Sequence, residues 1–319
     1  MKRVLLTGAA GFVGPYLIRE MKAGGWDVIA TKLPSESIEP VEGVEIRDLD
    51  VMKPSDLDCL SEVQPDCVIH LAGISSVKFS WQNPDLTMDV NIKGVSHLLE
   101  SIRKMQEKPR VLLIGSSEIY GLSQKRGVLL EDMPAEPANY YAISKYAQEK
   151  MGFMLGNAYG IQVISTRSFN HIGPGQNDTF VVPSFCRQIA EIEAGLRNPV
   201  ILVGNLNVSR DFTDVRDIVR AYRFLTEEGK PGTLYNVGSG KAVHLDDLLK
   251  KLISMSTRQI SVRVDPSRFR PADMPYVQAG IDRLQRDTGW APVHELEDTL
   301  RETLDSWREQ VQREMEQKT

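Results

Sequence analysis

Six short apolar runs, rich in β-branched residues, recur in the first half of the chain and leave room for a helix between successive runs. They occupy residues 4–6, 28–30, 44–46, 68–71, 111–114 and 163–165. The runs hardly alternate between apolar and polar side chains, which is typical of parallel strands buried on both faces of a sheet. Because amphipathic stretches separate them, the pattern predicts an α/β fold with a doubly wound parallel sheet of the Rossmann type.

The regular order of strand and helix breaks at about residue 168. Glycine and proline then cluster in HIGPGQND, a helical pattern runs from 183 to about 194, and later segments mix short strands with helices. We therefore predict a dinucleotide-binding Rossmann domain over 1–168, to which 208–240 returns. A smaller α/β substrate domain is predicted over 169–319.

Neither end of the chain resembles a targeting or membrane segment. The opening, MKRVLLTGAAGFVG, turns glycine-rich before an apolar signal-peptide region can form. The tail over 295–312 repeats apolar residues at helical spacing among charges, which predicts an amphipathic helix packed on the body. No apolar run approaches the roughly 20 residues of a membrane helix, so no membrane partner is expected.

Composition limits the other partners. The 319 residues include 25% charged side chains and carry a net charge of −5, with lysines and arginines scattered among acids. A nucleic-acid partner is therefore not expected. Three cysteines without a C-x-x-C pair fit reduced thiols in a cytoplasmic protein. The five histidines show no ligand spacing, so no metal site is predicted.

A glycine pattern follows the first predicted strand directly. Gly8, Gly11 and Gly14 form G-x-x-G-x-x-G, with Phe12 and Val13 beginning the next helical pattern. Glycines at such a turn let backbone N–H groups approach a pyrophosphate at the helix N-terminus. The sequence therefore predicts that these five residues bind a dinucleotide cofactor.

The end of the second predicted strand bears on the choice of cofactor. An NAD-preferring protein usually offers an acid there to the ribose 2′-hydroxyl, but this strand ends in Thr31 and Lys32. These two side chains would instead meet a 2′-phosphate, which favours NADP and leaves NAD open; the alternative is that Lys32 is a solvated loop residue. Asp50, after the third strand, is expected either to contact the adenine edge or to cap a turn.

The stretches GSSEIYG and NYYAISKYAQE contain the candidate catalytic residues. Tyr141 and Lys145 are four residues apart, so they share one helix face, whereas Tyr140 is excluded by its spacing. An unperturbed tyrosine has a pKa of about 10, and a neighbouring cation stabilises its phenolate. The pair is therefore predicted to exchange protons with a substrate hydroxyl or carbonyl, with the hydroxyl of Ser116 on the same substrate oxygen. Glu118 is either a catalytic base or a neighbouring binding residue.

Several of these motifs together resemble the extended short-chain dehydrogenase/reductase family over nearly the whole chain. The matching stretches are TGAAGFVG, HLAG, GSSEIYG, YYAISK, RSFNHIGPGQ, SRDFTDVRDIV, YNVGSG and RPADMP. The resemblance implies that Tyr141 is the catalytic acid or base and that Lys145 supports it and binds the nicotinamide ribose. Ser116 would orient the sugar oxygen. The resemblance also adds cofactor contacts at Val51, Leu71, Ala72 and Gly73.

Members of this family act on nucleotide sugars, and the resemblance implies a substrate site in the second half of the chain. Asn170, Arg210 and Arg270 are expected to hold the pyrophosphate and Asp273 the ribose hydroxyls, since arginine offers a fork of donors to phosphate. Ser75, Ser76 and Val77 resemble the loop over the sugar. His171 either lines this pocket or packs, whereas Arg187 and Arg216 are expected to form surface salt bridges. The guanine base is expected between 180 and 205.

Within the family, the motifs are most similar to those of reductases that convert GDP-4-dehydro-6-deoxy-D-mannose to GDP-D-rhamnose. The alternatives are GDP-mannose 4,6-dehydration with Glu118 as the base, and 4-epimerisation of another nucleotide sugar. Dehydratases typically carry Gln-Asp in place of Phe12-Val13 and Trp-Gly in place of Phe212-Thr213, which favours reduction. The resemblance also implies a homodimer formed through helices around 91–105 and 141–158.

Overall fold

The computed structural model describes residues 2–121, 127–269 and 274–317. Seven parallel strands form its main sheet, in the order β11-β7-β5-β4-β1-β2-β3. Their bounds are β1 (Arg3–Thr7), β2 (Asp27–Lys32), β3 (Val44–Asp48), β4 (Cys67–His70), β5 (Arg110–Ser116), β7 (Val163–Ser168) and β11 (Leu234–Val237). All six predicted runs lie in this sheet, and the predicted doubly wound α/β fold is confirmed.

Both faces of the sheet are covered, which explains why the runs do not alternate. In β1, Val4 and Leu6 belong to one hydrophobic cluster, and Leu5 between them belongs to another. The first cluster includes helices α1 (Gly14–Ala23), α8 (Val215–Glu228) and α10 (Asp282–Thr288). The second includes α2 (Cys59–Val63) and α5 (Gly94–Lys104), with α6 (Tyr140–Tyr159) packed against it. Each strand therefore buries successive side chains on opposite faces.

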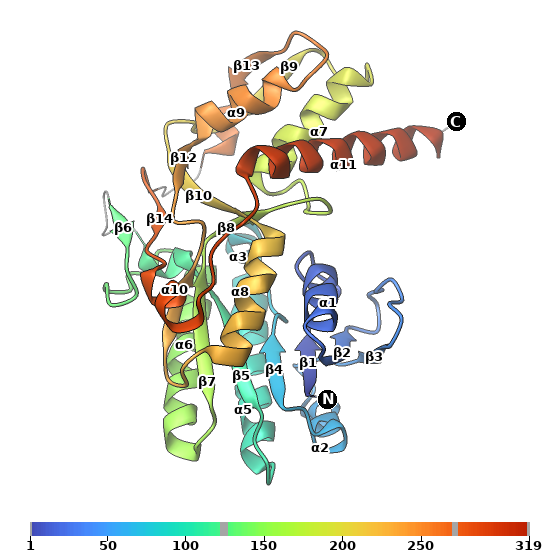
Figure 1. The fold of residues 1–319 in the computed structure, drawn as a ribbon. Coiled ribbons are helices and arrows are strands. Elements are labelled where there is room, and N and C mark those ends of the chain that lie inside the picture. Colours follow the sequence, from blue (N-terminus) through green and yellow to red (C-terminus); the bar gives the residue numbers. More distant parts are fainter. Residues whose placement is uncertain (1, 122–126, 270–273, 318–319) are drawn as a thin grey trace.

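A second group of elements lies above the main sheet in Figure 1 and has a hydrophobic cluster of its own. Three short strand groups occur there and beside it. They are β12 (Ala242–His244), β10 (Ser209–Asp214) and β8 (Asn170–Ile172); β13 (Ser261–Val264) and β9 (Val200–Val203); and β14 (Gln278–Ala279) and β6 (Val128–Leu129). Helices α7 (Val181–Glu193), α9 (Leu245–Ser254) and α11 (Leu296–Glu316) complete the group.

The remaining short helices are α3 (Val77–Gln82), α4 (Pro84–Met88), η1 (Pro54–Asp58), η2 (Asp89–Lys93), η3 (Ser117–Tyr120) and η4 (Pro266–Arg268).

Helix α11 confirms the prediction for the tail. Its apolar residues Leu300, Leu304, Trp307 and Val311 are buried in the hydrophobic cluster of this upper group, and Leu296 packs against that cluster partly buried. Among the helices of the described residues, none combines the length and the apolar character that a membrane span requires.

The carboxylate of Asp211 connects the two parts of the molecule. It lies at the middle of β10 with no exposed surface; besides the Thr213 hydroxyl of the same strand, at 3.5 Å, it accepts hydrogen bonds from four donors in other segments. These are the Ser239 N–H at 2.8 Å, the Ser239 hydroxyl at 2.6 Å, and the N–H groups of Gly240 and Ala279, each at 3.0 Å. Such a saturated buried carboxylate holds β10, the segment after β11 and β14 in one arrangement beside the carboxyl edge of the sheet.

Candidate active site

Helix α6 and strand β5 bring three predicted catalytic residues together. Asn139 begins α6 by accepting a hydrogen bond from the Ala142 N–H at 2.8 Å, so that Tyr141 lies in the first turn. Ser116 ends β5 near the Tyr141 side chain, and its hydroxyl lowers the pKa of that phenol. Tyr141 is only 8% exposed and Lys145 only 6%. The spacing argument thus placed both residues on a face that the fold buries against β5.

The environment of Tyr141 favours a protonated phenol. Its pKa is raised to about 12, chiefly by burial and also by the negative charge of Glu118, while the neighbouring Ser116 hydroxyl acts to lower it. Glu118 also accepts a hydrogen bond from the Asn139 side-chain amide, Nδ2 to Oε2, at 3.3 Å. Tyr141 is therefore suited to donate a proton to an oxygen that becomes negative.

Lys145 directs its ammonium toward β5. Its Nζ donates to the Ile114 carbonyl at 2.8 Å and to Gln148 Oε1 at 3.1 Å. The Gln148 amide donates in turn to the same carbonyl at 3.0 Å. Burial lowers the pKa of Lys145 to about 8. The expectation that this ammonium stabilises the Tyr141 phenolate remains a prediction.

The glycine turn fits a dinucleotide. Gly8 has a φ of +67°, and a Cβ there would lie 2.5 Å from the Ala72 Cα; a Cβ on Gly14 would overlap the Ala9 carbonyl. At Gly11, a Cβ would meet only the Gly8 carbonyl oxygen, at 3.6 Å, and would otherwise enter open space. Two of the glycines are thus required by packing, whereas the third leaves room for a ligand next to the backbone.

The HLAG segment closes against this turn through the backbone. The Leu71 N–H donates to the Thr7 carbonyl at 3.1 Å, and the Ala72 N–H donates to the Thr7 hydroxyl at 3.3 Å. Gly73 has a φ of +156°, and a Cβ there would approach Asn91 Oδ1 to 2.8 Å. The predicted cofactor residues of β1 and β4 therefore lie at one edge of the sheet.

The predicted residues of the adenosine side lie at the ends of β2 and β3. Lys32 forms an ion pair with Asp48, Nζ to Oδ1 at 2.6 Å. Thr31 is buried, Val51 is 5% exposed, and Asp50 Oδ1 accepts a hydrogen bond from the Met52 N–H at 2.9 Å. Asp50 therefore caps a turn in the structure, as one of its two alternatives predicted. Its contact with adenine remains a prediction. Lys32 is ion-paired rather than simply solvated.

The predicted substrate residues that the structure describes lie on separate elements: β8, β10 and the start of α3. Asn170 is exposed at the start of β8, and Arg210 on β10 donates from Nη1 to the Ser209 carbonyl at 2.8 Å. Ser76 begins α3 by accepting from the Phe79 N–H at 3.2 Å, with Ser75 before it and Val77 after it. Arg270 and Asp273 lie outside the described residues. Whether these residues bind a substrate remains a prediction.

The contacts of three other residues favour packing or ion pairing. The ring of His171 stacks on Phe12 with an interplanar angle of 3°, so it packs against the glycine turn. Arg187 forms ion pairs with Asp178, Glu191 and Glu314, and Arg216 with Asp214 and Glu302. Both arginines thus take the salt-bridge role that was expected of them.

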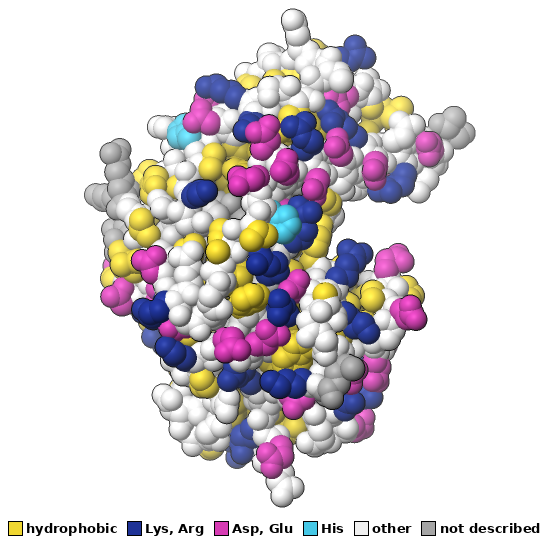
Figure 2. All heavy atoms as spheres, viewed as in Figure 1, with side chains coloured by type: hydrophobic (Ala, Val, Ile, Leu, Met, Phe, Trp, Pro, Cys, Tyr) yellow, Lys and Arg dark blue, Asp and Glu magenta, His cyan; other side chains and the backbone are white. Residues whose placement is uncertain are grey.

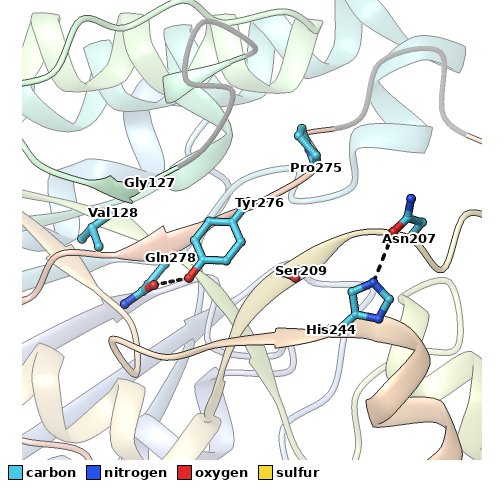
Figure 3. Close-up of a pocket in the computed structure, with 8 residues that line it drawn as sticks. All are labelled: Gly127, Val128, Asn207, Ser209, His244, Pro275, Tyr276 and Gln278. Carbon is cyan, nitrogen blue, oxygen red and sulfur yellow. Dashed lines mark hydrogen bonds between the residues drawn. The ribbon is translucent and has the colours of Figure 1, made fainter.

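A cavity of about 510 Å³ opens beside β10 and β14. Figure 3 shows Tyr276 donating a hydrogen bond to Gln278 and the His244 ring facing Asn207, at 3.4 Å from Nε2 to Oδ1. Its lining residues are Gly127, Val128, Asn207, Ser209, His244, Pro275, Tyr276 and Gln278. Ser209 directly precedes Arg210, so the cavity begins next to a predicted phosphate-binding residue. Its volume lies within the range of ligand sites, roughly 300–1,000 Å³.

Sequence reasoning missed several residues of the site. Asn139 could have been found, because asparagine directly before a helical pattern is a typical N-cap signal. Asn91 donates to the Ser144 hydroxyl at 2.9 Å, and Gln148 contacts Lys145. The roles of Asn91 and Gln148 depend on packing between separate elements, which spacing does not reveal.

No metal site was predicted, but the described residues include one cluster of potential metal ligands. His244, Asp246 and Asp247 have ligand atoms within 4.8 Å of one another at the start of α9. Sequence reasoning missed this cluster because it found no ligand spacing among the histidines. The three residues are partly or fully exposed, and exposed acidic groups often gather without an ion.

Known proteins resemble this sequence over nearly its whole length. The model of the GDP-mannose 4,6 dehydratase family matches residues 5–303. The GDP-6-deoxy-D-mannose reductase of Pseudomonas aeruginosa is 33% identical over 98% of this chain and 99% of its own length. The GDP-mannose 4,6-dehydratase of Vibrio cholerae is 28% identical over 98% of this chain and 95% of its own.

A solved structure agrees over the same extent. The structure of RMD from Pseudomonas aeruginosa complexed with NADPH superposes with a TM-score of 0.87 at 33% identity and covers 97% of this chain and 100% of that one. A match of this length in sequence, together with the seven-stranded sheet and the Ser116, Tyr141 and Lys145 arrangement, identifies the family. The chain is a member of the GDP-mannose 4,6-dehydratase family of extended short-chain dehydrogenases/reductases.

Proposed function

We propose that this protein is an oxidoreductase that uses NADPH to reduce the C4 ketone of GDP-4-dehydro-6-deoxy-D-mannose to GDP-D-rhamnose. The observation that carries the proposal is the burial of Ser116 at the end of β5 together with Tyr141 and Lys145, which lie one turn apart on α6. Support comes from the GDP-6-deoxy-D-mannose reductase that matches the chain over nearly its full length.

Tyr141 is the residue that supplies the proton. Hydride transfer to a ketone generates an alkoxide, and an acid within hydrogen-bond reach of that oxygen must protonate it. The pKa of Tyr141, raised to about 12 by burial and by the Glu118 charge, keeps the phenol protonated at neutral pH. Ser116 orients the ketone oxygen, and the Lys145 ammonium favours the developing negative charge. In this reaction Glu118 accepts a hydrogen bond from a sugar hydroxyl and takes no proton from carbon.

A bound reduced nicotinamide supplies the hydride for this reaction. The open space at Gly11 and the backbone of Gly8 and Gly14 would receive its pyrophosphate, with Phe12 and Val13 directly before helix α1, which begins at Gly14. Thr31, Lys32, Asp50 and Val51 would face the adenosine, and Leu71, Ala72, Gly73, Tyr141 and Lys145 would line the nicotinamide half. NADPH is the proposed donor because Lys32 stands where an acid is usual. The similar structure from Pseudomonas aeruginosa is a complex with NADPH, which supports this choice. NADH is the second candidate.

The substrate would span from Tyr141 toward the cavity beside β10. Arg210 and Asn170 would hold the diphosphate, with Ser75, Ser76 and Val77 next to the sugar. Arg270 and Asp273, which lie outside the described residues, would complete the site. The cavity next to Ser209 is large enough for one half of a nucleotide sugar.

We also propose a domain division, an oligomeric state and a cellular location for this protein. We divide the chain into a cofactor domain at 1–168, with 208–240 returning to it, and a nucleotide-sugar domain at 169–319. The protein is proposed to form a homodimer through the helices at 91–105 and 141–158, where Ile143 and Met154 of α6 are 41% and 58% exposed. The cytoplasm is the proposed location because the cysteines are free thiols.

The decisive experiment follows reduced-nicotinamide absorbance after addition of GDP-4-dehydro-6-deoxy-D-mannose to purified protein, with a parallel incubation with GDP-mannose and no added reductant. Stoichiometric cofactor oxidation in the first mixture alone supports the reductase. A keto sugar that accumulates in the second, without net cofactor change, would instead identify a dehydratase with Glu118 as its base. Conversion of a 4-epimer pair with cofactor retained through purification would identify an epimerase.

A further inference from the structure

The ion pair between Lys32 and Asp48 occupies the end of the sheet at which a dinucleotide's adenosine would bind. The two residues are the last of β2 and β3 and lie directly opposite each other in the parallel register. Their Nζ and Oδ1 atoms are 2.6 Å apart, and Nζ also donates to the Leu33 carbonyl at 3.3 Å. The Lys32 side chain is 17% exposed and that of Asp48 is 56% exposed. The lysine is therefore oriented by its neighbours, and the carboxylate faces solvent.

This position determines which dinucleotide a Rossmann fold accepts. An acid at the end of β2 bonds the ribose 2′-hydroxyl, and a cation there accommodates a 2′-phosphate. Lys32 supplies the cation, yet its charge is shared with Asp48. A phosphate bound to the Lys32 ammonium would lie roughly 5–6 Å from the Asp48 carboxylate, a distance at which like charges repel appreciably even near a protein surface.

A second carboxylate, that of Glu36, lies in the segment that follows β2. Glu36 Oε2 accepts a hydrogen bond from the Leu33 N–H at 3.0 Å. Figure 2 shows basic and acidic side chains interspersed on the visible edge of the molecule over β2 and β3, with no single sign dominating it. The ion pair with Asp48 is thus the closest charge contact of Lys32 in a region of mixed charge.

We propose that Asp48 is a cofactor-selectivity residue that weakens binding of the adenosine 2′-phosphate. Lys32 attracts the phosphate while Asp48 repels it and holds the ammonium, so that the protein distinguishes NADPH from NADH less strongly than Lys32 alone would allow. The inference rests on the proposed function only in requiring that the chain bind a nicotinamide dinucleotide.

The test is a direct binding titration of Asp48→Asn without any sugar. The dissociation constants of NADPH and of NADH are measured separately, from energy transfer between the protein's tryptophans and the reduced nicotinamide. Removing the carboxylate charge is expected to lower the dissociation constant of NADPH about fivefold at low salt and to leave that of NADH within about twofold. High salt should shrink the gain, because screening weakens a charge effect at an exposed site.

A matched control lies on the same strand. Glu45→Gln removes the same charge from β3 at its opposite end, where Glu45 pairs with Arg47, and lies about 10 Å from Asp48 along the strand. This variant should leave both dissociation constants unchanged. Lys32→Met should raise the dissociation constant of NADPH alone.

Two outcomes would overturn the inference and differ in what else they affect. If Asp48→Asn binds NADPH no more tightly than the unmodified protein, Asp48 does not oppose the phosphate, and the proposed reductase stands. If the unmodified protein binds neither dinucleotide, the proposed function fails and the inference fails with it.

Discussion

Arg167 and Glu149 form a bidentate ion pair in the interior, with Nε to Oε2 at 2.9 Å and Nη2 to Oε1 at 3.0 Å. Both side chains are at most 3% exposed, and the guanidinium lies over the Tyr120 ring at 4.5 Å. Glu149 is one helical turn beyond Lys145 on α6, and Arg167 belongs to β7, which pairs with β5. The pair therefore fastens the helix that carries the predicted catalytic residues to the strands beside Ser116.

Glu149→Ala should lower the free energy of unfolding by about 3–5 kcal/mol, because it leaves the Arg167 charge buried without a partner. Urea denaturation followed by circular dichroism measures the change. The control is Arg301→Ala, which breaks the exposed pair with Glu297 and should cost about 0.5 kcal/mol or less. Equal losses in the two variants would contradict the structural role of the buried pair.

Tyr141→Phe should lower kcat about 10²- to 10⁴-fold, since it removes the proton donor while keeping the ring that α6 buries. Binding of the nucleotide sugar, measured by calorimetry, should stay close to that of the unmodified protein. Tyr140→Phe serves as the control, because Tyr140 is 38% exposed and lies off the Lys145 spacing. A Tyr141→Phe enzyme with unimpaired turnover would sink the proposed mechanism.

The kcat of the reductase should fall as pH rises through about 8. The pKa of Lys145 is lowered to about 8 by burial, so the ammonium loses its charge there, whereas Tyr141 remains protonated because burial raises its pKa to about 12. A pH profile of kcat measures this limb, and Lys145→Arg, which stays charged, should move it to higher pH. A limb that stays in place in Lys145→Arg would assign it to another group.

The same lowered pKa has a consequence for stability with a definite sign. Between about pH 8 and the ordinary lysine value, the unfolded state holds a proton on Lys145 that the folded state lacks, so this group's contribution becomes more favourable as pH rises. Its penalty is largest below about pH 8. Lys145→Met should therefore be more stable than the unmodified protein at about pH 7, and the difference should shrink toward about pH 10. Urea denaturation of both proteins at these two pH values measures it.

Gly11→Ala should fold normally and bind cofactor poorly. Its Cβ meets no protein atom closer than 3.6 Å and enters the space expected for the pyrophosphate, so we expect dinucleotide affinity to fall by about tenfold or more. Gly8→Ala should instead lower the free energy of unfolding, since its φ is +67° and its Cβ would press on Ala72. Thermal melts and dinucleotide titrations of both variants separate the two effects, and identical behaviour would refute the distinction.

Glu118→Gln should keep reductase turnover within about tenfold of the unmodified enzyme, because a hydrogen-bond acceptor for a hydroxyl is needed and a base is not. The amide oxygen can still accept from Asn139. Turnover with GDP-4-dehydro-6-deoxy-D-mannose is the measurement. A loss as large as that of Tyr141→Phe would show that Glu118 exchanges protons during the reaction.

The local parts of this protein follow from periodicity and residue chemistry. The apolar runs predicted six of the seven strands of the main sheet, because a strand buried on both faces is mostly apolar. They did not include β11, the strand at the edge next to β7. Glycines at 8, 11 and 14 predicted the turn before α1, and the spacing of four predicted that Tyr141 and Lys145 share a helix face. Each of these signals lies within a few residues, where backbone geometry alone relates sequence to structure.

Tertiary packing decided which distant residues meet. Nothing in the strand patterns indicated that Lys32 would be paired with Asp48, that Lys145 would direct its ammonium to the Ile114 carbonyl, or that Asp211 would bind the segment after β11. The stacking of His171 on Phe12 likewise depends on a contact between distant segments. Sequence determined the elements because local periodicity encodes them, whereas charge pairs and the cavity depended on strand order, register and side-chain packing, which bring together residues far apart in the chain.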